Sequence, residues 1–218
     1  MNSPGLGSEV MTLADFDSRY REKYNIVCGC DEAGRGPLAG DVFAAAVVFD
    51  KDTVIDGIND SKKLSEKKRE KLFDEIKQKA LYWSIKTASV EEIESINILN
   101  CAMLAMKRAV EDLPVKPDIC LIDGNKTPQL DTVTEAIVGG DGKSQCIAAA
   151  SILAKVARDR YMLEVAKQYP QWQFEKHKGY GTKLHYEMID KYGASPVHRQ
   201  SFLKKYYAKL SEKQQENR

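Results

Sequence analysis

Short apolar runs alternate with longer amphipathic stretches along the chain, and this pattern predicts the order of strands and helices. Runs rich in apolar, often β-branched residues indicate buried strands at 26–30, 42–49, 81–88, 119–122 and 133–138. Apolar positions at helical spacing predict helices at 13–24, 66–80, 89–113 and 144–169. This order favours an α/β fold in which helices flank a mixed five-stranded sheet.

Local signals mark the ends of several of these helices. Ser65 can cap the second helix, and Ser89 with Glu92 forms a capping box at the start of the third. Pro114 then ends the third helix, because proline cannot continue it. The residues after about 173 are rich in Lys, His and Tyr, and they predict loops and short helices packed at one edge.

The length of the chain allows one domain with an appendage. At roughly 100–200 residues per domain, 218 residues would be crowded as two full domains. We expect residues 1–11 to be a flexible leader or a cloning remnant and residues 12–193 to form the main domain. Residues 194–218 are expected to form a small C-terminal helical extension packed on that domain.

Composition points to a protein that stays inside the cell. No apolar run approaches the roughly 18–20 residues of a membrane span, and the first residues lack the pattern of a signal peptide. The number of cysteines, five, is odd, and no two of them form a C-x-x-C pair. This is typical of buried, reduced thiols, and the spacings do not match those of a zinc site. We therefore expect a cytoplasmic monomer that does not bind membranes.

The net charge of +1 conceals two parts of opposite sign. Residues 1–141 hold 18 Lys and Arg against 25 Asp and Glu, whereas residues 142–218 hold 15 against 7. The first part is therefore acidic and the second basic. A basic part of this kind favours a polyanionic partner, although basic helices that face solvent would give the same count.

Carboxylates follow three of the predicted strands. Asp31 and Glu32 follow the first apolar run, Asp123 follows the fourth, and Asp141 comes shortly after the fifth. Functional groups gather at strand ends in open α/β sheets, so these acids are expected to lie close together. Clustered carboxylates repel one another, and an all-oxygen set without His or Cys favours Mg²⁺ or Mn²⁺. The alternative is that each acid is a separate turn or helix-cap residue.

A glycine-rich loop comes directly after the first acidic pair. In Gly34-Arg35-Gly36 the glycines allow backbone amides to approach a ligand, and the arginine can fork onto a phosphate or sugar oxygen. The loop lacks the spacing of a Walker loop or a dinucleotide-binding loop. Taken alone, the tripeptide is also compatible with an ordinary tight turn.

The basic part interleaves aromatic and cationic side chains, a combination that suits a nucleic-acid backbone and its bases. Most of the rings are expected in the core, but Gly179 and Gly181 indicate that Tyr180 lies on an exposed loop. The cationic residues of this stretch include Lys176, Lys178, Lys183 and His185.

Seven segments form a recognisable set. They are C-D-E-A-G-R-G-P-L-A-G at 30–40, D-S-K-K-L at 60–64, L-I-D-G-N at 121–125, G-G-D-G-K-S at 139–144, A-A-S-I-L-A-K-V-A-R-D at 149–159, G-Y-G-T at 179–182 and S-P-V-H-R-Q-S-F at 195–202. Together they resemble the ribonuclease HII (type 2 ribonuclease H) family over nearly the whole chain, from about Tyr24 to Tyr207. The resemblance implies a ribonuclease H-like fold. It also implies an enzyme that hydrolyses the RNA strand of RNA–DNA hybrids and cuts 5′ to ribonucleotides embedded in duplex DNA.

The resemblance also implies roles for individual residues. The family's catalytic, metal-binding acids fall on Asp31, Glu32, Asp123 and Asp141, the same four that follow the predicted strands. Its ribose sensor falls on Gly34, Arg35 and Gly36, its junction-sensing tyrosine on Tyr180, and a lysine that contacts the nucleic-acid backbone on Lys62.

One position departs from the family pattern. Where the family usually reads G-P-V, this chain has Gly40-Asp41-Val42. The change should alter local rigidity, and the extra carboxylate could weaken the binding of substrate near the metal centre.

The implied mechanism is phosphodiester hydrolysis with two Mg²⁺ or Mn²⁺ ions, leaving 3′-hydroxyl and 5′-phosphate ends. The 2′-hydroxyl distinguishes the substrate from DNA, so the partner is an RNA–DNA hybrid or a ribonucleotide-containing duplex and the role is removal of ribonucleotides. One alternative is a non-catalytic module that binds hybrids. Another is a type 3 ribonuclease H, which typically has an N-terminal substrate-binding domain. The roughly 24 residues before the first predicted strand are too few to form such a domain.

Overall fold

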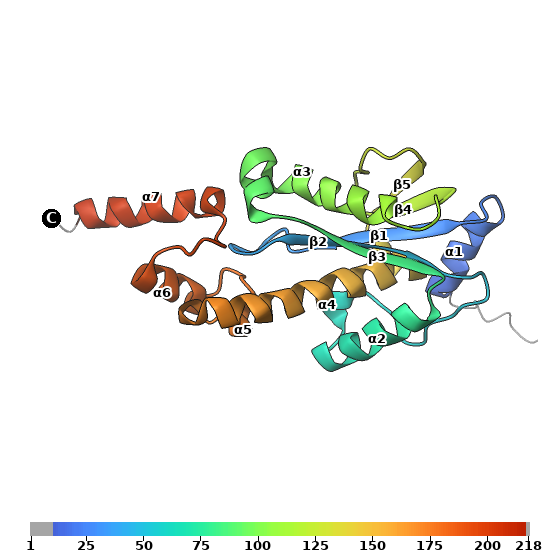
Figure 1. The fold of residues 1–218 in the computed structure, drawn as a ribbon, viewed down its shortest axis with the longest axis horizontal. Coiled ribbons are helices and arrows are strands. Elements are labelled where there is room, and N and C mark those ends of the chain that lie inside the picture. Colours follow the sequence, from blue (N-terminus) through green and yellow to red (C-terminus); the bar gives the residue numbers. More distant parts are fainter. Residues whose placement is uncertain (1–10, 217–218) are drawn as a thin grey trace, which may run out of the picture.

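A single mixed sheet of five strands in the order β3-β2-β1-β4-β5 forms the centre of the molecule (Figure 1). The computed structural model describes residues 11–216, so nearly all of the predicted leader lies outside the described residues. The central strand β1 pairs antiparallel with β2 and parallel with β4. The outer pairs are antiparallel for β2 with β3 and parallel for β4 with β5. The strands are β1 (Val27–Ala33), β2 (Val42–Val48), β3 (Tyr82–Ala88), β4 (Ile119–Asp123) and β5 (Val133–Ile137).

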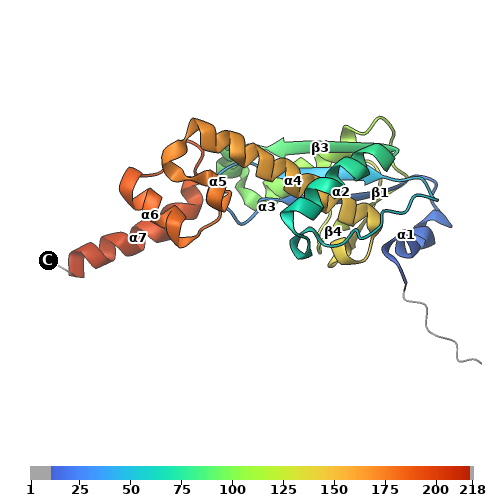
Figure 2. The same cartoon turned by 90° about the horizontal axis from the view of Figure 1, so that it is seen from below.

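Helices cover both faces of this sheet. One face packs against α3, and the other packs against α4 and α2 (Figure 1). Beyond one end of the sheet, α5, α6 and α7 lengthen the molecule, and α7 projects from that end (Figures 1 and 2). The α-helices are α1 (Leu13–Arg21), α2 (Glu66–Lys79), α3 (Val90–Glu111), α4 (Gln145–Gln168), α5 (Phe174–His177), α6 (Lys183–Tyr192) and α7 (Gln200–Glu216). Three short 3₁₀ turns are η1 (Ser61–Lys63), η2 (Gly140–Gly142) and η3 (Pro170–Trp172).

The predicted fold class is confirmed, and the differences lie in element boundaries. β1 pairs with β2 as far as Ala33, so Asp31 and Glu32 lie inside the strand and not after it. The helix predicted as continuous over 89–113 is interrupted at Asn97, whose φ is 67°. The Asn97 side-chain oxygen accepts from the amides of Leu99 and Asn100 and so caps the second segment of the helix. At 17 residues, α7 is also longer than the short helices predicted for the C-terminal part. The boundary at 194 stays a prediction.

The long helix α4 begins where two side chains satisfy amides of its first turn. The Ser144 hydroxyl accepts from the amide of Ile147 at 3.1 Å. Asp17 of α1 is fully buried, and its carboxylate accepts from the amide of Cys146 at 2.9 Å. Because carboxylates and hydroxyls at a helix N-terminus satisfy donors that lack partners within the helix, these contacts fix where α4 starts.

The structure bears on the predicted state of the cysteines and on the apolar character of the helices. All five cysteines are unpaired and buried, as predicted. Among residues 11–216, no helix has both the length and the apolar character that crossing a membrane would require.

α4 approaches β1 so closely that only glycine fits beneath it. A Cβ atom added at Gly29 would lie 2.2 Å from the carbonyl carbon of Cys146 and 2.3 Å from the amide nitrogen of Ile147. Both of these atoms belong to backbone, which cannot move aside as a flexible side chain could. Gly29 therefore sets the distance between the sheet and the helix.

The substitution Gly29→Ala should lower the free energy of unfolding by about 1–3 kcal/mol, because overpacking at this contact pushes α4 away from β1. Urea denaturation measures the change. Gly142→Ala is the matched control, since a Cβ at Gly142 meets no atom within 4 Å. Equal stability of the two variants would contradict the proposed contact.

Candidate active site

Three carboxylates meet at one end of the sheet. Asp31 lies near the end of β1, Asp123 is the last residue of β4, and Asp141 lies in η2 shortly after β5. Because β1, β4 and β5 are parallel neighbours, their carboxyl ends lie at the same edge. One oxygen atom from each acid lies within 4.8 Å of the others. The interpretation of these acids as unrelated turn residues is therefore wrong for these three.

Hydrogen bonds hold two of the acids together through the backbone. The Oδ1 atom of Asp123 accepts from the amide of Gly140 at 2.7 Å and from the amide of Asp141 at 3.4 Å. The turn that carries Asp141 is thus attached to the end of β4. The same turn leads into Ser144 and α4, so the position of Asp141 depends on the packing of that helix.

Burial and mutual repulsion raise the pKa values at this centre. The pKa of Asp31 lies well above its ordinary value because of burial, reinforced by the charges of Glu32 and Asp123. Burial and the neighbouring Asp123 likewise raise the pKa of Asp141. Buried like charges of this kind need a proton or a cation nearby. The donor set contains carboxylate oxygens alone, so the three residues fit a hard divalent cation such as Mg²⁺ or Mn²⁺.

Glu32 lies beside this cluster but is not one of the three converging acids. Its carboxylate forms an ion pair of 3.2 Å with Arg35. On a β-strand, successive side chains leave opposite faces, which separates Glu32 from Asp31. Its role as a fourth metal ligand stays a prediction.

Lys62 also points toward the cluster of acids. Its amine lies 4.0 Å from the Asp141 carboxylate, and its side chain is largely exposed. Partial burial opposes its charge, but Asp141, Asp31 and other acids outweigh this effect and raise the pKa of Lys62. A buried hydrogen bond of 2.9 Å between the hydroxyls of Ser61 and Ser151 fixes the lysine's turn against α4. Lys62 therefore carries a positive charge at the edge of the acidic centre.

A groove of about 580 Å³ runs beside the acids, and all five predicted substrate-binding residues line it. Its lining includes the predicted residues Glu32, Gly34, Arg35, Gly36, Lys62 and Tyr180. The Tyr180 ring is 39% exposed, as its flanking glycines predicted. Sequence reasoning thus identified segments that are far apart in the chain but line one groove.

The groove also contains residues that the sequence analysis did not select. The Lys155 amine lies 5.4 Å from the centre of the Tyr180 ring and 2.7 Å from the carboxylate of Asp159. A lysine inside the apolar first half of α4 is the signal that could have identified it. The other lining residues outside the predicted set are Ala33, Ser61, Ile98, Ser151 and Phe202.

Asp41 faces away from this groove. Its Oδ1 atom accepts from the amide of Val90, the first residue of α3, at 3.1 Å. Burial raises the pKa of Asp41. The carboxylate therefore adds a second cap to α3 beside Ser89, and it does not line the groove as an extra acid near the metal centre would.

The three histidines of the chain pack together beneath the Tyr180 loop, so His185, which the sequence analysis counted among the cationic residues suited to nucleic acid, belongs to the core. His185 is fully buried, and its ring stacks on His177 with centroids 4.1 Å apart. Its Nδ1 atom lies 2.9 Å from the carbonyl of Tyr180, and its Nε2 atom lies 2.9 Å from the Nε2 atom of His198. The alternation of basic and aromatic residues did not distinguish this core packing from an exposed surface.

The hydrogen bonds assign a neutral form to two of these rings. The amide of Ser195 donates to Nδ1 of His198, so the proton of His198 is on Nε2 and is donated to His185. His185 in turn donates its Nδ1 proton to the Tyr180 carbonyl. Burial lowers the pKa of His185 to about 4 and that of His198 to about 3. The Tyr180 loop is therefore supported by a chain of uncharged rings.

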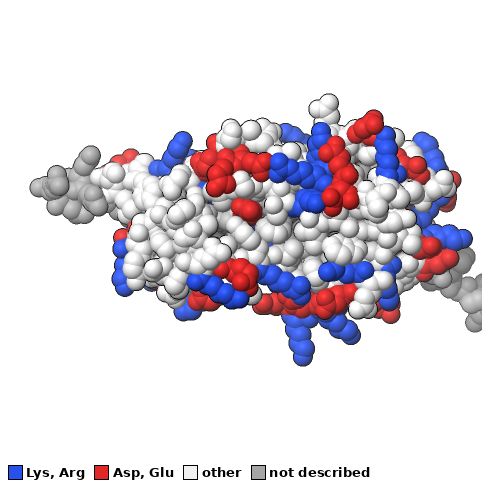
Figure 3. Space-filling view, viewed as in Figure 1, with Lys and Arg blue, Asp and Glu red and all other residues white. Residues whose placement is uncertain are grey.

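The surface charges are mixed on the face of the molecule seen in Figure 1. Acidic and basic side chains lie interspersed along both long sides of this face, and neither sign forms a single patch there (Figure 3). The opposite charge of the two parts of the sequence does not divide this face into an acidic and a basic half.

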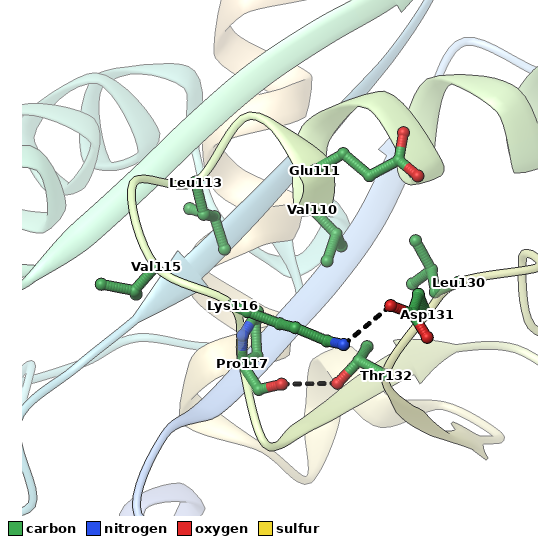
Figure 4. Close-up of a pocket in the computed structure, with 9 residues that line it drawn as sticks. All are labelled: Val110, Glu111, Leu113, Val115, Lys116, Pro117, Leu130, Asp131 and Thr132. Atoms are coloured by element: carbon green, nitrogen blue, oxygen red, sulfur yellow. Dashed lines mark hydrogen bonds and ion pairs between the residues drawn. The ribbon is translucent and has the colours of Figure 1, made fainter.

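A second cavity, of about 210 Å³, lies at the opposite end of β4 (Figure 4). It is lined by residues from the end of α3 and from the segments before β4 and β5. Of its three charged residues, Lys116 and Asp131 form an ion pair of 2.9 Å with each other, and the third is Glu111. The cluster of Asp31, Asp123 and Asp141 lies at the other end of β4, away from this cavity.

Comparisons with known proteins agree on one family. A family model described as Ribonuclease HII matches residues 28–205. The ribonuclease HII of Idiomarina loihiensis is 62% identical over 177 residues, which are 81% of this chain and 95% of that protein. The ribonuclease HII of Caldicellulosiruptor bescii is 56% identical over 183 residues, which are 84% of this chain and 89% of that protein.

Solved structures of similar fold include the ribonuclease H2 of Pyrococcus horikoshii OT3. It has a TM-score of 0.68 at 26% identity and covers 81% of this chain and 93% of its own. Bst-RNase HIII, solved in complex with Mn²⁺, has a TM-score of 0.62 at 17% identity and covers 77% of this chain and 63% of its own. The second likeness is one of fold alone.

The neutral histidine chain predicts a loss of stability in mild acid. The folded-state pKa values of His185 and His198 lie below the unfolded value of about 6.5, so the unfolded state takes up protons first as pH falls. The contribution is fully present above about pH 6.5 and is lost progressively toward pH 4. Urea denaturation between pH 7.5 and 5 should show this decline. In His198→Asn, which removes one titrating ring, the decline should be less steep, and an unchanged slope would contradict the assignment.

The acidic cluster predicts stabilisation by divalent cations. Mn²⁺ should raise the melting temperature of the wild type, and an ion concentration of about 100 Kd corresponds to about 2.7 kcal/mol. Asp141→Asn should reduce or abolish this rise, because it removes one of three converging carboxylates. Thermal denaturation with and without Mn²⁺ measures both effects. A wild type that does not respond to Mn²⁺ would argue against a metal site.

Proposed function

The chain belongs to the ribonuclease HII family, whose members cleave the RNA of RNA–DNA hybrids, and from this premise we propose how its site selects and cuts a substrate. The enzyme hydrolyses the RNA strand of hybrids and cuts 5′ to single ribonucleotides in duplex DNA. The products carry 3′-hydroxyl and 5′-phosphate ends. The observation that carries this proposal is the convergence of Asp31, Asp123 and Asp141 beside the groove that holds the G-R-G loop and Tyr180.

The acidic residues divide into three that converge and one at the edge of the groove. Asp31, Asp123 and Asp141 would hold the cations, and we assign Glu32, at the edge of the same groove, as the fourth ligand. Two bound Mg²⁺ or Mn²⁺ ions would lower the pKa of the attacking water and offset the charge on the leaving 3′ oxygen. The attachment of Asp141 to Asp123 keeps these carboxylates at fixed positions before substrate binds.

The remaining residues of the groove read the nucleic acid. Gly34, Arg35 and Gly36 face the ribonucleotide and contact its 2′-hydroxyl, the group absent from DNA. Tyr180 packs its exposed ring on the sugar of the following deoxynucleotide. Lys62 contacts a backbone phosphate with its charged and largely exposed amine.

The partner is an RNA–DNA hybrid or a duplex containing ribonucleotides, and the role is removal of ribonucleotides from DNA. Five buried, unpaired cysteines support a reducing compartment such as the cytoplasm, where we place a monomeric enzyme. Relatives of 62% and 56% identity are type 2 enzymes, whereas Bst-RNase HIII shares 17%. Family membership therefore favours a type 2 enzyme over both a type 3 enzyme and a non-catalytic binding module.

The proposal can be tested with a DNA duplex that contains one ribonucleotide, incubated with Mg²⁺ or Mn²⁺ beside a long hybrid and an all-DNA duplex. The wild type should cut 5′ to the ribonucleotide and leave the all-DNA duplex intact. Asp123→Asn should lower the cleavage rate by about 100-fold or more, because several kcal/mol of charge stabilisation depend on the cations.

Asp131→Asn is the matched control, since Asp131 pairs with Lys116 at the far end of β4 and should leave cleavage unchanged. Equal cutting of the all-DNA duplex would exclude recognition of the 2′-hydroxyl. Full activity of Asp123→Asn would exclude its assignment as a metal ligand.

A further inference from the structure

A buried arginine shapes the loop that contains Gly34, Arg35 and Gly36. Arg199 precedes α7 and is fully buried. Its guanidinium has five N–H groups, and all five donate to backbone carbonyls of residues 34–40. The bonds run from Nε to Gly40 (2.9 Å), from Nη1 to Arg35 (3.1 Å) and Pro37 (2.8 Å), and from Nη2 to Gly34 (2.7 Å) and Gly40 (2.6 Å).

These contacts differ from an ordinary buried ion pair, because the partners of Arg199 are carbonyl dipoles of one short segment. Burial and the nearby charge of Arg158 lower the pKa of Arg199 to about 9, which leaves it charged at neutral pH. A planar group with five fixed donors can hold four carbonyls at once, whereas the three donors of a lysine cannot reproduce that geometry. The conformation of the loop therefore fits a guanidinium group.

A second buried arginine also binds carbonyls of this loop. Arg158 of α4 donates from Nη2 to the carbonyl of Ala39 and from Nε to that of Asp41, at 3.1 and 3.2 Å. Its Nη1 atom donates to the carbonyl of Lys178 at 3.1 Å, which connects the loop to the segment that carries Tyr180. A Cβ atom at Gly34 would lie 2.2 Å from Nε of Arg158, so glycine is required where arginine and loop meet.

The arrangement leaves the amides of residues 34–36 available to a ligand. Farther along the loop, the amide of Leu38 donates to Gly179 and that of Gly40 donates to Val197, both at 2.8 Å. Within residues 11–216, the amides of Gly34, Arg35 and Gly36 donate to no protein acceptor. These three residues line the groove, while the carbonyls of Gly34 and Arg35 are bound by Arg199.

We propose that Arg199 is a positioning residue for ribonucleotide recognition: it binds the carbonyls of the Gly34–Gly40 loop so that the amides of residues 34–36 are presented to the sugar. The inference rests on the proposed function of this groove. It assigns Arg199 no contact with substrate or metal. Loss of its contacts should therefore reduce selectivity for a ribonucleotide and leave the acidic centre intact.

The test compares Arg199→Lys and Arg199→Met with the wild type on a duplex containing one ribonucleotide, with an all-DNA duplex as competitive inhibitor. Selectivity is the ratio of the inhibition constant of the DNA to the KM of the ribonucleotide duplex. We expect this ratio to fall at least about 10-fold in both variants, because displacement of a group by about 1 Å can lower a rate about 100-fold. Mn²⁺ affinity measured by calorimetry should stay within about 2-fold of the wild type.

Arg108→Lys is the matched control for lost stability. Arg108 also donates to a backbone carbonyl, that of Thr87, and forms an ion pair with Glu92, but it lies on α3 away from the loop. Its variant should lose stability while its selectivity stays unchanged.

Several outcomes would overturn the inference. One is an unchanged selectivity ratio in Arg199→Lys and Arg199→Met, and another is an equal loss of selectivity in Arg108→Lys. If neither Arg199 variant folds while Arg108→Lys does, Arg199 serves the fold and not recognition. A wild type that fails to cut the ribonucleotide duplex would instead contradict the proposed function itself.

Discussion

The contact between α4 and β1 is the constraint on which the rest of the structure depends. Gly29 allows the helix backbone to approach the strand, so the start of α4 lies directly over the middle of the sheet. From there the helix carries Ser151 and Lys155 along one side of the groove, and Arg158 to the carbonyls of the neighbouring loop. The turn that precedes it carries Asp141 to the acids of β1 and β4. The contact that packs the core therefore also determines where the charged groups lie.

The acidic centre is destabilising, and the packing of the core has to offset the repulsion between its carboxylates. Three carboxylates with oxygen atoms within 4.8 Å of one another repel, and burial of Asp31 strengthens the effect. A protein selected for stability alone would separate them. The sheet holds them together because Asp31 and Asp123 lie on the buried inner strands β1 and β4, and the turn that carries Asp141 is hydrogen-bonded to Asp123. Functional sites commonly retain strain or repulsion that the surrounding core compensates.

The sequence predicted those features that depend on local pattern. The capping box at Ser89 and the position of the acids at or near the ends of strands follow from residues that are close in the chain, and the structure agrees with both. The interruption at Asn97 was not predicted, because the apolar spacing continues through it. His185 was counted with the cationic residues because composition does not show that three histidines from separate segments pack together in the core. Arg158 and Arg199 lay in recognised segments without a role, since their partners are carbonyls far along the chain.

The choice of carbonyls as partners for the two buried arginines has an electrostatic consequence. A carboxylate partner would cancel each positive charge and add to the negative charge of the acids nearby. Carbonyl dipoles stabilise a guanidinium without cancelling its net charge, and in a buried site of low dielectric that charge acts over a longer distance. Arg158 and Arg199 thus leave positive charge beside the loop that borders the groove, and the nearby charge of Asp41 offsets only part of it. For a substrate with a phosphate at every nucleotide, this charge offsets part of the repulsion from Asp31, Asp123 and Asp141, and it does so from positions that the substrate need not touch.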